Sequence, residues 1–232
     1  MYIALIGASA VAQDDPDALY RDRETLASAT RAATIWNERL TTNPKDFESA
    51  WKLARAQYWL GTNGLPERER KAALEAGIAA GRKAIAIDSS RPDGHFWMAA
   101  NMGALAESFG LRQGIRYRTP VREALEQVLK IDAPYLDGSA DRALGRWYYK
   151  VPGLFGGDKR KSETHLRKAL TYNPNSIITH LFLAETLIEL DRPADARKEL
   201  EAALAAPISE NWAPEDRRFK AQAKVLLSRL RG

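Results

Sequence analysis

Residues 174–207 read PNSIITHLFLAETLIELDRPADARKELEAALAAP, and this stretch decides the fold. Apolar residues recur in it at three- and four-residue spacing on both sides of the turn Asp191-Arg192-Pro193, which predicts two helices joined as a hairpin. Pro193 suits the first turn of the second helix, because the N–H that proline lacks would have no partner there. Pro174 and Pro207 mark the two ends of the unit.

Similar units precede this one along the chain. A large residue followed by a small one, inside a predicted first helix, stands at Leu53-Ala54, Met98-Ala99, Leu144-Gly145 and Leu183-Ala184. The pattern predicts an all-α chain of about four helical hairpins, at residues 44–89, 90–133, 134–174 and 175–207. Helices over 18–40 and 215–230 are expected to cap the array, the last with Val225, Leu226 and Leu230 facing inward. Residues 13–232 would then form a single domain.

The unit at 174–207 resembles a tetratricopeptide repeat, because the positions of its large and small residues match those of that family. The matching residues are Leu183, Ala184, Leu187, Ala196, Leu200 and Ala203. The resemblance implies a solenoid of helical hairpins, each made of a helix A and a helix B, around a concave groove.

A narrower resemblance rests on the segment Pro152-Gly-Leu-Phe-Gly-Gly-Asp158 and the helix around His165 to Leu170 that follows it. From Ile85 to the end, the sequence is similar to the T component associated with TRAP transporters, and more distantly to the repeat domain of the regulator of microtubule dynamics family. The first similarity implies a periplasmic protein that works beside substrate-binding proteins and membrane permeases. Members are commonly lipoproteins anchored through an N-terminal cysteine, and this sequence has no cysteine.

The spacing of the repeats exceeds the usual period of about 34 residues. We place the excess between helix A and helix B of the first three repeats, as long insertions at residues 61–66, 108–120 and 151–158. Insertions at equivalent positions of a solenoid emerge along one edge, so these three are expected to form a rim.

Composition excludes several classes of function. The sequence holds 35 Lys and Arg against 30 Asp and Glu, and its charged runs mix signs or fit solvated helix faces, so we expect dispersed charge and no nucleic-acid partner. No segment reaches the ~18 apolar residues of a membrane span. Without cysteine, and with His95, His165 and His180 not spaced as ligands, no metal or cofactor is expected. No catalytic motif is present, so we predict a protein that is not an enzyme.

Residues 1–13, MYIALIGASAVAQ, are apolar and small, and an acidic stretch follows them. Ala10-Val11-Ala12 fits the small-x-small site of a signal peptidase, which predicts residues 1–12 as a signal-peptide remnant and a periplasmic or secreted protein. The basic segment that usually opens a signal peptide is missing. The alternative is native sequence at the start of a cytoplasmic protein.

Helix periodicity assigns the groove-lining positions. The expected binding residues are Trp51, Arg55, Tyr58, Phe96, Arg142, Arg146 and Tyr149. Aromatic walls with arginines on one side would suit an extended or amphipathic ligand that bears a carboxylate. The aromatic residues could instead pack between repeats, and the arginines could form ordinary surface ion pairs.

Together these features predict a non-enzymatic exported repeat protein that binds a partner protein or a small organic ligand in its groove. The resemblance adds a role as an accessory component of a TRAP-type solute uptake system, with a periplasmic substrate-binding protein as the partner. The alternative is a cytoplasmic scaffold that holds a peptide or helix of another protein.

Overall fold

The computed structural model describes residues 14–230, and they form an all-α solenoid with no strand among them. The predicted fold class is confirmed. The signal-peptide prediction for residues 1–12 lies outside the described residues. The elements are α1 (Pro16–Arg21), α2 (Leu26–Thr42), α3 (Phe47–Trp59), α4 (Glu67–Ile87), α5 (Pro92–Ser108), α6 (Leu111–Ile131), α7 (Tyr135–Lys150), α8 (Lys159–Tyr172), α9 (Ile177–Glu189), α10 (Pro193–Ala205) and α11 (Ala213–Arg229), with a π-helical turn η1 (Leu60–Gly64) and a 3-10 turn η2 (Gly153–Phe155).

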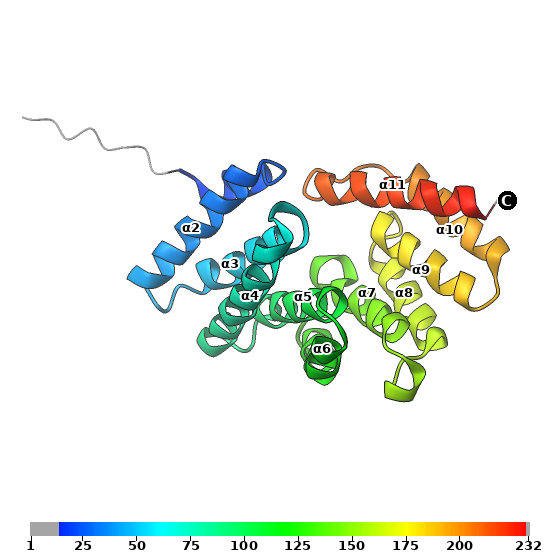
Figure 1. Cartoon of the computed structure of the whole chain (residues 1–232), viewed down its shortest axis with the longest axis horizontal. Helices are drawn as coiled ribbons and strands as arrows, with labels where there is room; N and C mark the ends of the chain where they lie inside the picture. The colour runs from blue at the N-terminus through cyan, green and yellow to red at the C-terminus, as the bar shows by residue number, and fades with distance from the viewer. Residues whose placement is uncertain (1–13, 231–232) are drawn as a thin grey trace, which may run out of the picture.

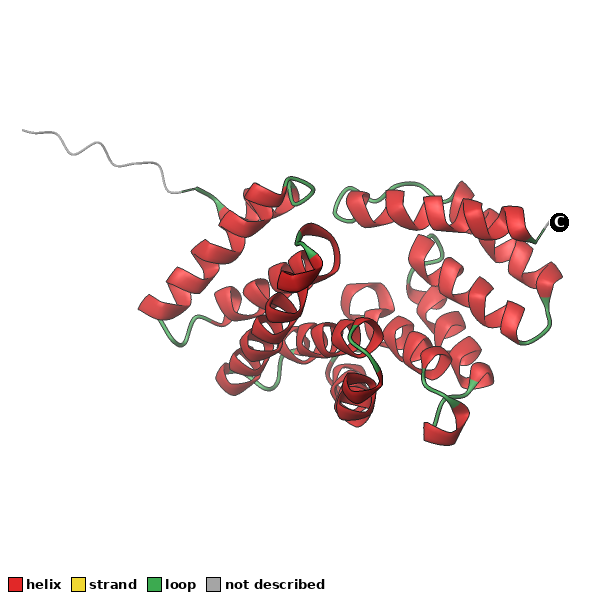
Figure 2. Ribbon diagram, in the orientation of Figure 1, coloured by secondary structure: helices red, strands yellow, loops and turns green. Residues whose placement is uncertain are grey.

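The helices pair in chain order as hairpins, α3 with α4, α5 with α6, α7 with α8 and α9 with α10. In Figures 1 and 2 the pairs follow one another around an arc, with α2 at one end and α11 at the other. The buried core divides into one cluster from Tyr20 to Trp147 and a second from Leu166 to Leu227.

The turn before the first hairpin and two of the three turns between hairpins share one hydrogen-bond pattern. The side-chain oxygens of Asn43, Asp88 and Asn173 each accept a hydrogen bond from the backbone N–H two residues later, at 3.2, 2.9 and 2.9 Å. Such turns let a short polar side chain replace the backbone partner that the helix end has lost. The same chemistry therefore ends one hairpin and starts the next.

Small residues set how closely neighbouring helices approach. A Cβ atom at Gly81 of α4 would lie 2.8–2.9 Å from atoms of Met98 in α5, and one at Gly145 of α7 would lie 2.5 Å from the Leu166 side chain in α8. Real Cβ contacts do not reach such distances, so these helix pairs need glycine at their crossings.

Three local expectations differ from the structure. The single helix expected over 18–40 is two helices, α1 and α2, separated by a turn that begins at Asp22. Residues 111–120, expected within an insertion, are the first turns of the long helix α6, whereas the first and third insertions contain the turns η1 and η2. Val225, expected to face inward, is 51% exposed, whereas Ala223 and Leu227 are the buried residues of that part of α11.

The two ends of the arc meet, so the solenoid closes on itself (Figure 1). Arg23, after α1, binds the Glu215 carboxylate of α11 through two nitrogens at 2.5 and 3.1 Å and donates to the Asn211 carbonyl oxygen at 2.8 Å. Its side chain is 3% exposed and lies over the rings of Tyr20 and Trp59. Arg217 of α11 also pairs with Glu24.

Candidate functional site

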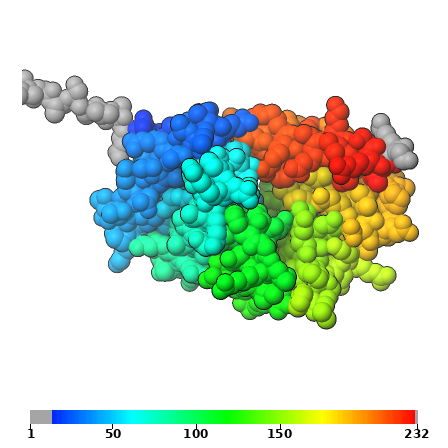
Figure 3. All heavy atoms as spheres, viewed as in Figure 1, coloured from blue at the N-terminus to red at the C-terminus, as the bar shows by residue number. Residues whose placement is uncertain are grey.

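The first helices of the hairpins face the inside of the arc, and α11 closes it. Figure 3 shows the surface indented between the cyan, orange and yellow-green segments. We call this space the inner groove. A Cβ atom at Gly103 of α5 would meet no atom within 4 Å, so the groove floor is open there. The groove is defined by Tyr58 (α3), Gly103 (α5), Arg142 and Arg146 (α7), Leu181 and Glu185 (α9), and Arg218 and Gln222 (α11).

Two arginines of the inner groove have no carboxylate partner. Within residues 14–230, no carboxylate oxygen lies within 4.0 Å of the side-chain nitrogens of Arg142 or of Arg218. The Nε atom of Arg218 is buried and has no hydrogen-bond partner in the described chain. Burial lowers the pKa of the Arg142 guanidinium, against the opposing pull of Asp137, Tyr58 and Asp216. The structure thus holds two cationic groups whose donor capacity is not used.

Tyr58 interacts electrostatically with both of these arginines. Burial raises the pKa of Tyr58, and the guanidinium groups of Arg218 and Arg142 pull it back down. Its ring packs against Trp97, with 5.9 Å between ring centroids. Tyr58 therefore presents a hydroxyl, which can donate or accept, beside two cations.

The third groove arginine is already neutralised. Arg146 contacts Glu185 at 2.5 Å and Glu107 at 3.4 Å, and its guanidinium lies 4.4 Å from the ring centroid of Phe182. It also lies 5.5 Å from the ring of Tyr149. This network joins α5, α7 and α9 and holds their orientation, so Arg146 is less available to a ligand than Arg142.

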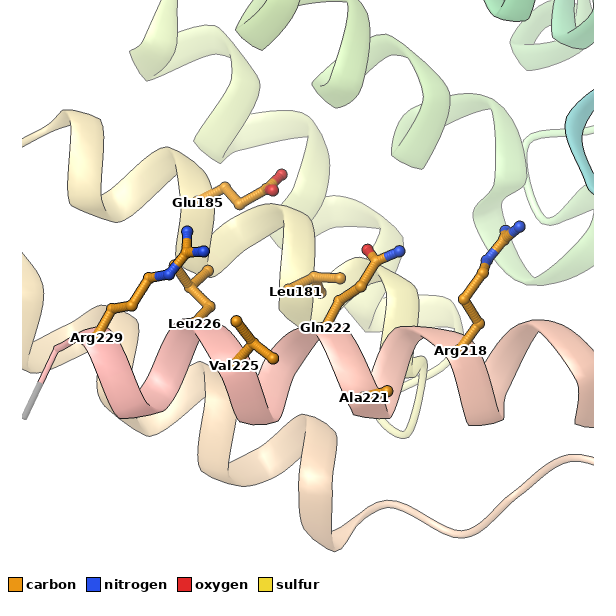
Figure 4. A pocket seen from close by; sticks show the side chains of 8 residues that line it. All are labelled: Leu181, Glu185, Arg218, Ala221, Gln222, Val225, Leu226 and Arg229. Carbon is orange, nitrogen blue, oxygen red and sulfur yellow. The ribbon is translucent and has the colours of Figure 1, made fainter. Parts of the chain in front are cut away.

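A hollow of about 440 Å³ continues the inner groove between α9 and α11. Figure 4 shows Arg218, Gln222 and Arg229 projecting from one side of α11 toward α9. The Glu185 carboxylate and apolar side chains form the rest of its wall, and the lining is Leu181, Glu185, Arg218, Ala221, Gln222, Val225, Leu226 and Arg229. The surface there combines an apolar strip with cationic ends and one carboxylate.

The remaining sequence-predicted site residues lie elsewhere. The Arg55 guanidinium stacks on Tyr20 at 4.1 Å and approaches Asp17 at 3.7 Å, so Arg55 is engaged with α1. Trp51 lies 5.0 Å from that guanidinium and donates to Glu48 of its own helix at 3.0 Å. Phe96 is 8% exposed and packs against Trp97 and Tyr135 in the core. Of the predicted set, the structure brings together Tyr58, Arg142 and Arg146, with Tyr149 at the edge.

Sequence reasoning missed Arg218. Its helix was interpreted only as a cap, and nothing local shows that α11 returns to face α3 and α7. The sequence carries no signal for this contact, because Arg23 and Glu215 each stand in a run of charged residues, at 21–24 and 215–218.

The described residues hold no group of three or more His, Asp or Glu side chains arranged for a metal ion. The histidines have structural partners, with His165 on Asp141 at 2.7 Å and His180 on Glu199 at 2.6 Å. No helix of residues 14–230 has the length and apolar character needed to cross a bilayer.

Two family models match the chain, each over more than half of its length. The model of the regulator of microtubule dynamics protein 1-3 matches residues 14–155, and the model of the TRAP transporter T-component matches residues 94–229. Both resemblances seen in the sequence are thereby confirmed. The T-component match lies within the stretch expected, from Ile85 to the end, whereas the microtubule-dynamics match covers the N-terminal part and not the C-terminal end.

Solved structures of other proteins share the fold. A thermophilic tetratricopeptide protein of Thermus thermophilus, TTC0263, is 21% identical with a TM-score of 0.68, and the match covers 91% of this chain and 97% of that one. MamA is 16% identical with a TM-score of 0.54 over 91% of this chain and 99% of its own. No curated protein matches the sequence.

The geometry and the comparisons agree on an all-α helical-repeat protein. The chain belongs to the two families whose models match it, the TRAP transporter T-component and the regulator of microtubule dynamics proteins, and its fold is that of a tetratricopeptide solenoid.

Proposed function

We propose that this protein is an exported, non-enzymatic component of a TRAP-type solute uptake system, and that its inner groove binds an anionic group. The occupant is a small organic carboxylate or the acidic segment of a partner protein such as the substrate-binding protein. The match to the T-component model supports the transporter role. One observation carries the binding role, namely that Arg142 and Arg218 face the inner groove and form no ion pair within 4.0 Å with a carboxylate of residues 14–230, Asp137 and Asp216 acting on Arg142 only from farther away.

The physical argument is the cost of that arrangement. Guanidinium groups removed from water lose hydration, and without a close carboxylate little of that cost is recovered. A carboxylate that enters the groove offsets this penalty, because arginine can bind it through two parallel hydrogen bonds. The Tyr58 hydroxyl adds a third donor from the opposite wall. The open floor at Gly103 leaves room for the occupant.

The binding proposal is tested by titration calorimetry with linear mono- and dicarboxylates and with an acidic peptide. The double variant Arg142→Gln/Arg218→Gln should weaken binding at least about tenfold, since a hydrogen bond to a charged group contributes roughly 1.5–3 kcal/mol. The matched control is Arg21→Gln/Arg68→Gln, two arginines with exposed side chains. Equal affinity of wild type and the groove variant would contradict the proposal, as would no binding at millimolar ligand.

The alternative is a scaffold that holds a helix of another protein in the hollow between α9 and α11. It is favoured by the apolar strip of that hollow, since an amphipathic helix lays its apolar face into such a groove. Native mass spectrometry followed by denaturing mass spectrometry separates the two functions. A small molecule released on denaturation supports the first, and a retained polypeptide supports the second.

A further inference from the structure

The turn after α7 holds two large apolar side chains out in solvent. Leu154 is 90% exposed and Phe155 is 41% exposed. The turn itself is fixed, because the N–H groups of Phe155 and Gly157 donate to the Pro152 carbonyl oxygen at 2.8 and 3.1 Å. A Cβ atom at Gly157 would lie only 1.6 Å from the Val151 carbonyl oxygen, so glycine is required there. The exposure of Leu154 is therefore a property of an ordered turn.

The first turns of α6 continue this apolar surface. Leu111 is 75% exposed and Ile115 is 57% exposed, four residues apart on one helix face. The Arg118 guanidinium lies 5.5 Å from the ring centroid of Phe155, and the Arg118 carbonyl oxygen accepts from Trp147 Nε1 at 2.9 Å. Helix α6 and the turn lie side by side along the lower part of Figure 1. They form one surface, which we call the basic edge.

The positive charge of the chain gathers at this edge. Residues 111–122 and 150–161 contain eight Lys and Arg and one Asp, an excess larger than the net charge of +5 of the whole chain. The charge is therefore less evenly dispersed than the mixed-sign runs of the sequence predict, because folding brings two separate segments together. In the described chain no carboxylate oxygen lies within 4.0 Å of the side-chain nitrogens of Arg112, Arg116, Arg118, Arg160 or Lys161.

We propose that the basic edge docks onto the surface of a lipid bilayer that contains anionic headgroups. Exposed apolar side chains on a convex turn can enter the boundary between headgroups and acyl chains, while neighbouring Lys and Arg reach the anionic headgroups. A nucleic acid would use the arginines and leave Leu111, Ile115 and Leu154 in water. A protein partner would need a matching pocket for a turn that protrudes. The bilayer alone satisfies both the charge and the apolar tips.

This docking does not depend on what occupies the inner groove. It places the protein on a membrane surface without a spanning helix, with the bilayer beside the edge at which the first and second helices of the hairpins connect.

The first experiment measures co-sedimentation of the purified protein with vesicles of phosphatidylcholine, with and without phosphatidylglycerol. Binding should need the anionic lipid and should weaken with added salt. Both Leu154→Ser/Phe155→Ser and Arg112→Glu/Arg116→Glu should lose at least about tenfold in the partition coefficient. Val225→Ser and Arg68→Glu are matched controls, because each changes an exposed residue of the same type away from the edge. All variants should retain the wild-type melting temperature.

The second experiment measures insertion directly. The sequence has no cysteine, so Leu154→Cys gives a single site for an environment-sensitive fluorophore, with Val225→Cys as the control. The emission at residue 154 should shift to shorter wavelength with anionic vesicles, and that at residue 225 should not. An unchanged emission at residue 154 overturns the proposal. The proposal is also overturned if the protein binds oligonucleotides and if this binding is lost in Arg112→Glu/Arg116→Glu but kept in Leu154→Ser/Phe155→Ser.

Discussion

His180 shows how one residue can couple stability to pH. Its ring nitrogens lie 2.6 Å from Glu199 Oε2 and 2.8 Å from the Pro174 carbonyl oxygen. Both partners are acceptors, so only the doubly protonated ring can donate to both. Burial alone would lower the pKa of His180, but the hydrogen bonds to Glu199 and Pro174 raise it above the usual value of 6.5. Arg167, 3.8 Å from Glu199, is the other charge at this carboxylate.

The sign of the pH dependence follows from this raised pKa. Below pH 6.5 the histidine is charged in both the folded and the unfolded chain, and its contribution to stability is fully present. As pH rises through the folded-state pKa, the folded ring loses its proton and one of its two hydrogen bonds, so the contribution is lost. The difference in melting temperature between wild type and His180→Gln should therefore shrink as pH rises from about 5.5 to about 8.5. Calorimetric scans across this range check it, and a difference that grows with pH would contradict it.

At the scale of the element, helix α6 shows where sequence reasoning fails. Gly110, Gly114 and Pro120 favour a loop, yet α6 runs from Leu111 to Ile131 with Pro120 inside. An internal proline costs a helix about 3 kcal/mol. Burial of Tyr117, Val121, Ala124, Leu125 and Val128 on one face of α6 offsets that cost. Tertiary packing therefore decides the conformation of this segment, and a local pattern does not contain that information.

The hairpins whose ends are marked by proline and polar turn residues could be predicted from the sequence. Asn173-Pro174 and Asp191-Arg192-Pro193 are local signals, and helices α9 and α10 begin and end close to them. Arg142 and Arg146 could be assigned to the groove from helix period alone, because their neighbours along α7 are buried on the other face. The position of Arg218 on the opposite wall could not be predicted, since it depends on how many hairpins are needed to close the arc.

Replacing glycine by alanine should change the free energy of unfolding in opposite directions at two positions. Gly81→Ala places a Cβ atom 2.8–2.9 Å from the side chain and backbone of Met98, so α4 and α5 must separate, at a cost of roughly 1–3 kcal/mol. Gly103→Ala meets no atom and gains helix propensity, which should stabilise the protein by up to about 1 kcal/mol. Urea unfolding of both variants measures the two effects. If both changes lower the free energy of unfolding equally, helix crossings do not explain the glycines.

At the scale of the whole molecule, the contact between the two ends of the chain determines which helix forms the wall of the inner groove opposite α7. A tetratricopeptide array is held together mainly by contacts between neighbouring hairpins. Here Arg23 and Glu215 join segments at opposite ends of the chain, and this contact positions α11 so that Arg218 faces α7. Without the closure the groove would lose one wall, and Arg142 would face solvent.

Glu215→Gln should weaken this closure strongly, although glutamine has nearly the same shape as glutamate, because the substitution removes the negative charge that Arg23 binds. The Arg23 guanidinium is nearly fully buried, and a buried charge that loses its partner costs roughly 3–5 kcal/mol, although the Asn211 and Tyr20 carbonyl oxygens retain part of the hydrogen bonding. Glu24→Gln is the matched control, because its ion pair with Arg217 is exposed and contributes at most about 1 kcal/mol.

Hydrogen exchange followed by mass spectrometry locates the effect of Glu215→Gln. Amides of residues 16–25 and 212–220 should exchange at least about tenfold faster than in wild type, while α5 to α8 keep their protection, because only the closure opens. Faster exchange in all helices would mean that the pair stabilises the whole fold, and unchanged exchange would mean that the neighbouring hairpins hold α11 in place. Because Arg218 lies on α11, local opening should also weaken anion binding in the inner groove, so one substitution connects closure to binding.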